Sequence, residues 1–180
     1  MKKTDYLVIL NTRSEEGKKI SKGDIITKHT GLPSRGGFGW NRPGIDYLVT
    51  LDGNLEVIIP EQSPSDVDLW GIRQGQKPMN GSVRYLAYAG GKAPIVKAEK
   101  SKKDANGIAE IAAKDKDTRT DQQKDTLATI VKFYVKRFPG IQVLGFNQIP
   151  VKEGQENPAF DVAGWLTEIE IPEKNIFKDL

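Results

Sequence analysis

Few side chains in this sequence can carry metal or nucleophile chemistry. The 180 residues include a single histidine, His29, and no cysteine. Zinc in proteins is held by histidine, cysteine and carboxylate groups, and a catalytic histidine needs a partner that orients it. The sequence reveals no such partner for His29, which ends a predicted helix. We therefore expect a structural or capping role for His29, and a catalytic site rebuilt around it is the less favoured alternative.

A second set of candidates lies in and after the glycine-rich stretch HTGLPSRGGFGWNRPG. Asp46 could act as a carboxylate base, although an aspartate that only faces a cleft is the more common case. Tyr47 and Tyr88 could line a sugar- or peptide-binding groove, but aromatic residues at such spacings are more often core residues. The residues that we expect to contact a ligand are Trp40, Asn41, Arg42, Asp46 and Trp70.

Composition limits the classes of partner. The 27 basic and 24 acidic residues leave a net charge of +3, which is too small to indicate nucleic acid or an acidic membrane surface. The first residues, MKKTDYLVIL, are too short an apolar run for a signal peptide or a membrane span. We expect no nucleic-acid partner, no membrane span and cytoplasmic synthesis, with later association with a virion left open.

Apolar periodicity and turn residues place the elements that must position these side chains. A capping box at Thr120 starts a long helix that Pro139-Gly140 ends, and Ser21 with Asp24 starts a shorter one. The expected strands are residues 5–10, a hairpin from 45 to 60 through Asp52-Gly53, residues 83–91 and residues 141–145. The order β-α-β-β-β-α-β-α predicts a single α/β domain over residues 1–180, with a mixed central sheet flanked by helices.

The segment from Lys92 to Asp117 is rich in lysine, alanine and aspartate and joins a strand to the long helix. A solvated surface insertion with a turn of helix is the favoured interpretation. We expect it to be exposed and more mobile than the sheet. A partner-binding loop is the alternative, because loops carry function more often than the elements that they connect.

Several motifs in this order resemble one family. They are YLVILNT, HTGLPSRGGFGWNRPGIDYLV, LDGNLEVIIPE, LAYAGG, DTRTDQQKDTLATIVKFYVKRFP and NPAFDVAGWL. Together they resemble the type 2 N-acetylmuramoyl-L-alanine amidases, the family of phage lysozyme-type amidases and peptidoglycan recognition proteins. The resemblance runs from Tyr6 to Leu166 and is greatest to the short amidases of Bacteroides-type bacteria and their phages. It implies the amidase fold.

The resemblance also implies a zinc site, which this sequence does not keep. The family holds zinc with two histidines and a cysteine, and a tyrosine and a lysine assist the attack on the amide. The matching ligand positions hold Leu10, Phe146 and Asn157, and the assisting positions hold Ile45 and Gln155. Leucine and phenylalanine offer no lone pair, and a neutral amide is a poor zinc ligand. We therefore expect no metal, no cofactor and no catalytic residue.

Three functions remain open at this point. The first is an inactive amidase-like protein, or pseudoenzyme, that binds peptidoglycan fragments (muropeptides) or a protein partner and is phage-associated. The second is a phage structural or accessory protein that uses the domain as a scaffold or regulator. The third and least favoured is a metal-independent hydrolase, because amide hydrolysis without zinc needs a nucleophile and a base that the sequence does not reveal.

Overall fold

A computed structural model of the 180-residue chain describes residues 3–60, 65–66, 81–94, 113–149 and 156–178. The β-strands are β1 (Tyr6–Asn11), β2 (Ser14–Glu15), β3 (Tyr47–Val49), β4 (Leu55–Val57), β5 (Ser65–Asp66), β6 (Ser82–Tyr88), β7 (Gly91–Lys92) and β8 (Gln142–Gly145). The α-helices are α1 (Lys22–Thr30), α2 (Asp121–Arg137) and α3 (Val162–Glu168), and the short 3-10 turns are η1 (Pro33–Arg35), η3 (Phe146–Gln148) and η4 (Glu173–Asn175). The predicted order of the main elements is confirmed.

The central sheet has the strand order β4-β3-β6-β1-β8, and β5 pairs with the end of β6. Strand β1 lies between β6 and β8 and runs parallel to both, whereas β4 and β5 are antiparallel to their neighbours. Leu7, Val8 and Ile9 have no exposed surface, as expected for a strand that is covered on both faces. The predicted α/β class with a mixed sheet is confirmed.

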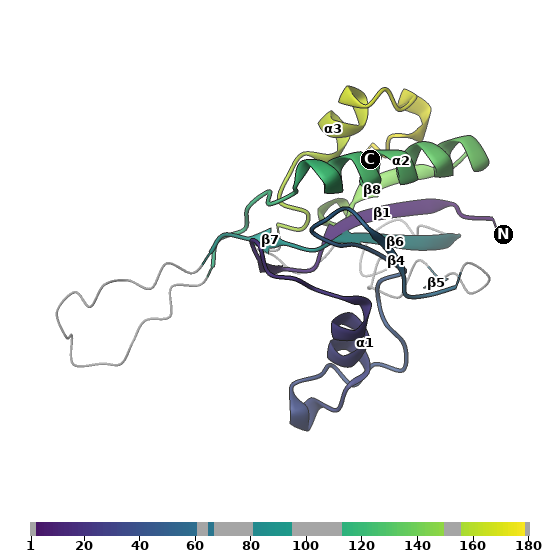
Figure 1. Ribbon diagram of the computed structural model, residues 1–180. Helices are drawn as coiled ribbons and strands as arrows, with labels where there is room; N and C mark the ends of the chain where they lie inside the picture. Colours follow the sequence, from purple (N-terminus) through teal and green to yellow (C-terminus); the bar gives the residue numbers. More distant parts are fainter. Residues whose placement is uncertain (1–2, 61–64, 67–80, 95–112, 150–155, 179–180) are drawn as a thin grey trace.

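Helices α2 and α3 cover one face of the sheet (Figure 1). The predicted capping box is present at Thr120, and Gln123 completes it through its side chain. The same Gln123 amide donates hydrogen bonds to the carbonyls of Val49 and Ala89, which ties the start of α2 to the ends of β3 and β6. A large buried cluster follows along this face, and Tyr134 on α2 hydrogen-bonds Tyr47 at 2.7 Å between the hydroxyl oxygens.

Helix α1 lies on the opposite face, and Figure 1 shows it standing away from the strands together with the segment that follows. Its predicted cap at Ser21 is present as a capping box with Asp24. Only Ile25 and His29 of this helix are buried. This face of the sheet is packed mainly by aliphatic side chains of β1, β3, β6 and β8. Helix α1 is thus held less extensively than α2.

Sequence reasoning missed a small second sheet. Strand β2 pairs in parallel with β7, and Lys92 forms an antiparallel bridge with Asp115. The bridge joins the two ends of the predicted insertion at 92–117, and the β2–β7 pair holds its first residue beside the segment after β1. Residues 95–112, on which the predictions of exposure, mobility and a turn of helix fall, lie outside the described residues.

Candidate functional site

The sheet brings the positions of the two expected histidine ligands together. In the parallel pair of β1 and β8, Ile9 is opposite Gly145. The residues that follow, Leu10 near the end of β1 and Phe146 just after β8, are therefore neighbours. Both side chains belong to one buried apolar cluster that also contains Ile45. The exposed fractions of Leu10, Ile45 and Phe146 are 3%, 3% and 4%. The positions that the resemblance assigns to two ligands and to the assisting tyrosine are therefore filled with packed hydrocarbon.

Asn157, at the expected cysteine position, is attached to the end of β1 by its side-chain amide. Its Oδ1 accepts a hydrogen bond from the backbone N–H of Asn11 at 2.7 Å, and its Nδ2 donates to the Asn11 carbonyl at 3.2 Å. Asn157 is 4% exposed. The amide thus pairs with the backbone of β1 as a neighbouring strand would. Hydrogen bonds, rather than a shared metal ligand set, join the last loop to the sheet here.

The residues at this site do not fit a zinc ion. Leucine, isoleucine and phenylalanine have no donor atom, and the Asn157 amide is already bonded to backbone groups. Over the described ranges, no three His, Cys, Asp or Glu side chains lie close enough together to hold a metal ion. Gln155, at the expected lysine position, lies outside the described residues.

Asp46 differs from the expectation that it faces a cleft. Its carboxylate is 1% exposed, and Oδ1 accepts from Nη1 of Arg84 at 2.9 Å while Oδ2 accepts from the backbone N–H of Tyr85 at 2.7 Å. Burial raises the pKa of Asp46, against the lowering effect of these two donors. Arg84 also donates to the carbonyl of Pro60. Asp46 is therefore part of a buried ion pair that joins β6 to the segment before β3.

Arg84 is the residue of this region that sequence reasoning missed. It stands in the run VRYLAYAGG, where its neighbours are nearly all apolar. An arginine in a buried strand needs a charged partner, because an unpaired buried charge is very costly. That argument could have pointed to Asp46, the acidic residue at the start of the adjacent strand.

His29 has the structural role that its position predicted. Its Nδ1 accepts a hydrogen bond from the backbone N–H of Gly44 at 3.0 Å, and its ring stacks on Phe38 and lies 4.8 Å from the Trp40 ring, measured between centroids. Burial, aided by the charge of Lys28, lowers the pKa of His29 to about 4. His29 is therefore neutral at physiological pH and serves as the inner layer of an aromatic cluster.

The other candidate binding residues fall into three groups. Trp40 and Asn41 are exposed at the end of the glycine-rich stretch, where a ligand could reach them, and Arg42 is half-buried beside them. Tyr47 and Tyr88 are core residues on the α2 face, not groove residues. Trp70 lies outside the described residues.

Comparisons with known proteins bear on the fold. No protein-family model matches the chain, and no curated protein matches it in sequence. Among solved structures, the Ph2119 endolysin from Thermus scotoductus bacteriophage Ph2119 has a TM-score of 0.58 at 16% identity, over 94% of this chain and 86% of its own. AmpD follows with a TM-score of 0.57 at 15% identity, over 93% and 85%.

A third similar structure is the ectodomain complex of peptidoglycan recognition proteins LCa and LCx with bound tracheal cytotoxin, with a TM-score of 0.54 at 13% identity, over 97% of this chain and 84% of that one. At such identities the similarity shows the fold alone. The described helices include none that is long and apolar enough to cross a bilayer. The chain has the amidase and peptidoglycan-recognition-protein fold, as its motifs predicted.

Proposed function

We propose that this protein is a catalytically inactive member of the amidase fold that acts by binding peptidoglycan fragments and is phage-associated. One observation carries the proposal: Leu10, Ile45 and Phe146 are buried together where the resemblance places the reaction centre. Asn157 completes the arrangement through two hydrogen bonds to the β1 backbone. None of these groups can activate water or hold a metal ion that does so.

The remaining candidate bases do not replace the missing chemistry. Asp46 is paired with Arg84 and has no exposed carboxylate oxygen with which to reach a substrate. The Nδ1 of His29 accepts from Gly44, and the ring is buried against Phe38 and Trp40. A general base must come within hydrogen-bond reach of the proton that it removes. Both residues are better explained by stability than by catalysis.

The exposed end of the glycine-rich stretch, a few residues before Ile45 in the chain, remains available for binding. Trp40 and Asn41 are exposed there, and a tryptophan next to polar side chains suits a ligand that has both an apolar face and amide or hydroxyl groups. The LCa–LCx structure of the same fold contains tracheal cytotoxin. The endolysin with this fold is a bacteriophage protein, which supports the phage association. These likenesses favour a muropeptide as the ligand.

Two assays on the purified full chain test the proposal. We expect no release of L-alanyl peptides from peptidoglycan, with or without added zinc, and measurable binding of a soluble muropeptide by calorimetry. Trp40→Ala should weaken that binding roughly tenfold, whereas Phe133→Ala, which removes another exposed aromatic side chain, on α2, should leave it unchanged. Release of L-alanyl peptides by the wild type would overturn the inactive assignment, and absence of muropeptide binding would overturn the ligand.

A scaffold or regulatory role in a phage particle is the second candidate. The filled apolar cluster at the reaction centre favours it, because a protein that no longer binds a ligand at that point gains stability from packing. Cofractionation of the protein with purified virions, together with no muropeptide binding, would favour this role over the first.

A further inference from the structure

The segment from residue 17 to residue 42, here called the α1 lobe, differs in charge from the rest of the chain. It contains α1, η1 and the glycine-rich stretch up to Arg42. Of the chain's 27 basic and 24 acidic residues, it holds six basic and one acidic, which leaves 21 and 23 elsewhere. His29 adds no charge, since its pKa is about 4. The six basic residues are Lys18, Lys19, Lys22, Lys28, Arg35 and Arg42. The positive charge of the protein is thus concentrated in this lobe.

Apolar side chains lie exposed among these charges. Leu32 is 60% exposed, Phe38 47% and Trp40 36%. The Lys28 ammonium lies over the Phe38 ring at 5.0 Å from its centroid, and the rings of Phe38 and Trp40 are 4.9 Å apart. Ile26 on α1 is also partly exposed, at 39%. Exposed apolar side chains among basic residues have the composition of a protein-binding patch, because aromatic and arginine side chains are enriched among the residues that contribute most to interface binding energy.

The backbone of the lobe holds these side chains in place. The N–H groups of Phe38 and Trp40 donate to the carbonyls of Lys28 and His29, at 2.8 and 2.9 Å. A Cβ atom at Gly37 would lie 2.2 Å from the Gly31 carbonyl oxygen, and Gly39 has a φ of 69°, so only glycine fits this path. A surface that is already ordered loses less conformational entropy when a partner binds.

We propose that the α1 lobe is a docking surface for an acidic protein segment that carries aliphatic or aromatic side chains. The acidic groups of the partner would face Lys28, Arg35 and Lys22, and its apolar side chains would cover Leu32, Phe38 and Trp40. This inference goes beyond the proposed binding of peptidoglycan fragments, since Trp40 is the one residue that the two surfaces share, and the charged side chains that would select the partner lie on α1 and η1.

Two other partners for a basic, aromatic surface fit less well. Single-stranded nucleic acid stacks its bases on open aromatic faces, whereas Phe38 already stacks on His29 and carries Lys28 over its ring. A bilayer surface favours a helix with one broad apolar face. The exposed part of α1 presents Lys22, Thr27 and Lys28 beside Ile26, so its outer surface is mainly polar.

The test uses the full chain and a displayed library of random short peptides. We expect the selected peptides to be enriched in Asp or Glu together with Leu, Phe or Trp. The affinities of the selected peptides, made by synthesis, are then measured by fluorescence anisotropy. Phe38→Ala, Leu32→Ser and the double variant K28E/R35E should each weaken binding roughly tenfold or more. The matched controls, Phe133→Ala and K132E/K136E on the exposed side of α2, should not.

The melting temperature of each variant shows whether it folds. Leu32 is more exposed than Phe38, so Leu32→Ser keeps the test valid if Phe38→Ala does not fold. The proposal would be overturned if no peptides were enriched, if basic peptides were enriched, or if the selected peptides bound the lobe variants as well as the wild type. Displacement of the selected peptides by single-stranded DNA, by anionic lipid vesicles or by a second copy of the chain would also overturn it. Failure of muropeptide binding alone would contradict the proposed function but would not contradict this docking surface.

Discussion

The two faces of the central sheet are held by different chemistry. On the α2 face, polar side chains join the helix to the strands: Gln123 bonds two strand carbonyls, and Tyr134 bonds Tyr47. On the α1 face, the described cluster consists mainly of aliphatic side chains, and α1 contributes Ile25 and His29. The α2 face thus has specific hydrogen bonds that fix the helix in one position. On the α1 face, apolar packing fills the point where the resemblance places the reaction centre.

This difference is consistent with the proposed loss of the reaction centre without loss of the fold. Leu10, Ile45 and Phe146 occur on the α1 face, where apolar side chains extend a cluster that already exists. Burial of such side chains is favourable by about 1.5–3 kcal/mol each. The polar contacts of the α2 face lie on the other side of the sheet and do not depend on the residue types at these three positions. The following experiments test this division, in order of decreasing expected effect.

Removal of the Arg84 guanidinium should have the largest effect. By strand alternation, Arg84 lies on the same side of β6 as Leu86 and Tyr88, which belong to the α2-side cluster. Arg84→Met leaves the Asp46 carboxylate buried without its charge partner, so we expect a loss of about 3–5 kcal/mol in the free energy of unfolding, measured with urea. The double variant Arg84→Met/Asp46→Asn, which keeps an acceptor for the Tyr85 N–H, should recover part of that loss. Equal stability of wild type and Arg84→Met would show that the ion pair is dispensable.

Introduction of the family's metal ligands should create a zinc site on the α1 face in place of the apolar packing. The triple variant Leu10→His, Phe146→His and Asn157→Cys places three ligands at positions that now hold two buried apolar side chains and one amide bonded to β1. We expect a loss of a few kcal/mol without metal. Zinc should then restore about 4 kcal/mol at a thousandfold excess over its dissociation constant, read as a rise in melting temperature.

The wild type, which has no cysteine, is the control for nonspecific zinc binding. A folded triple variant that gains no more from zinc than the wild type would show that the three positions do not converge. The position-by-position match to the family would then be wrong. Amidase activity need not return, because Ile45 and Gln155 still lack the assisting groups.

The sequence was sufficient for most of the framework. The capping boxes at Ser21 and Thr120 and the turn at Asp52-Gly53 depend on local hydrogen bonds and glycine conformation, so they are visible in a short window of sequence. The short strands β2 and β7 were missed because two-residue strands have no periodicity. Their pairing depends on contacts between segments far apart in the chain.

The candidate site could be predicted only in part. The apolar nature of positions 10, 45 and 146 is plain from residue type. The role of Asn157 is not, because its partners are backbone groups of Asn11, 146 residues away in the chain. Asp46 was misplaced for a related reason: its partner Arg84 lies on another strand. Polar side chains whose partners are remote in sequence are the part of a site that local patterns do not reveal.

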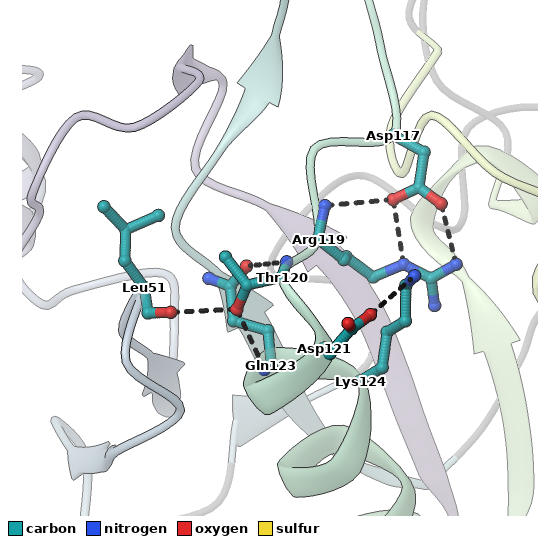
Figure 2. Close-up of polar contacts among 7 residues, drawn as sticks. All are labelled: Leu51, Asp117, Arg119, Thr120, Asp121, Gln123 and Lys124. Atoms are coloured by element: carbon teal, nitrogen blue, oxygen red, sulfur yellow. Dashed lines mark hydrogen bonds and ion pairs between the residues drawn. The ribbon is translucent and has the colours of Figure 1, made fainter.

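An ion pair lies just before helix α2, and its removal should have a moderate effect on stability. Figure 2 shows the Arg119 guanidinium donating two hydrogen bonds to the Asp117 carboxylate just before α2. The Arg119 guanidinium also lies over the Phe160 ring at 3.3 Å from its centroid and near Trp165 of α3. Arg119→Ala should cost about 2 kcal/mol of unfolding free energy. Lys124→Ala, which breaks the exposed pair with Asp121 in the same view, should cost less than about 0.5 kcal/mol. Equal effects of the two changes would mean that this ion pair is not specific.

The smallest effect concerns pH and the α1 face. The pKa of His29 is about 4 in the folded protein and 6.5 in the unfolded chain, so the unfolded state takes up the proton first as the pH falls. The contribution of neutral His29 is fully present above pH 6.5 and is lost as the pH falls from 6.5 towards 4. Between pH 7 and pH 5 this lowers the free energy of unfolding by about 1–2 kcal/mol. His29→Gln does not titrate and can still accept from Gly44, so its stability should fall less over the same range. Parallel stability–pH curves for wild type and variant would show that His29 is not held neutral by the α1 lobe.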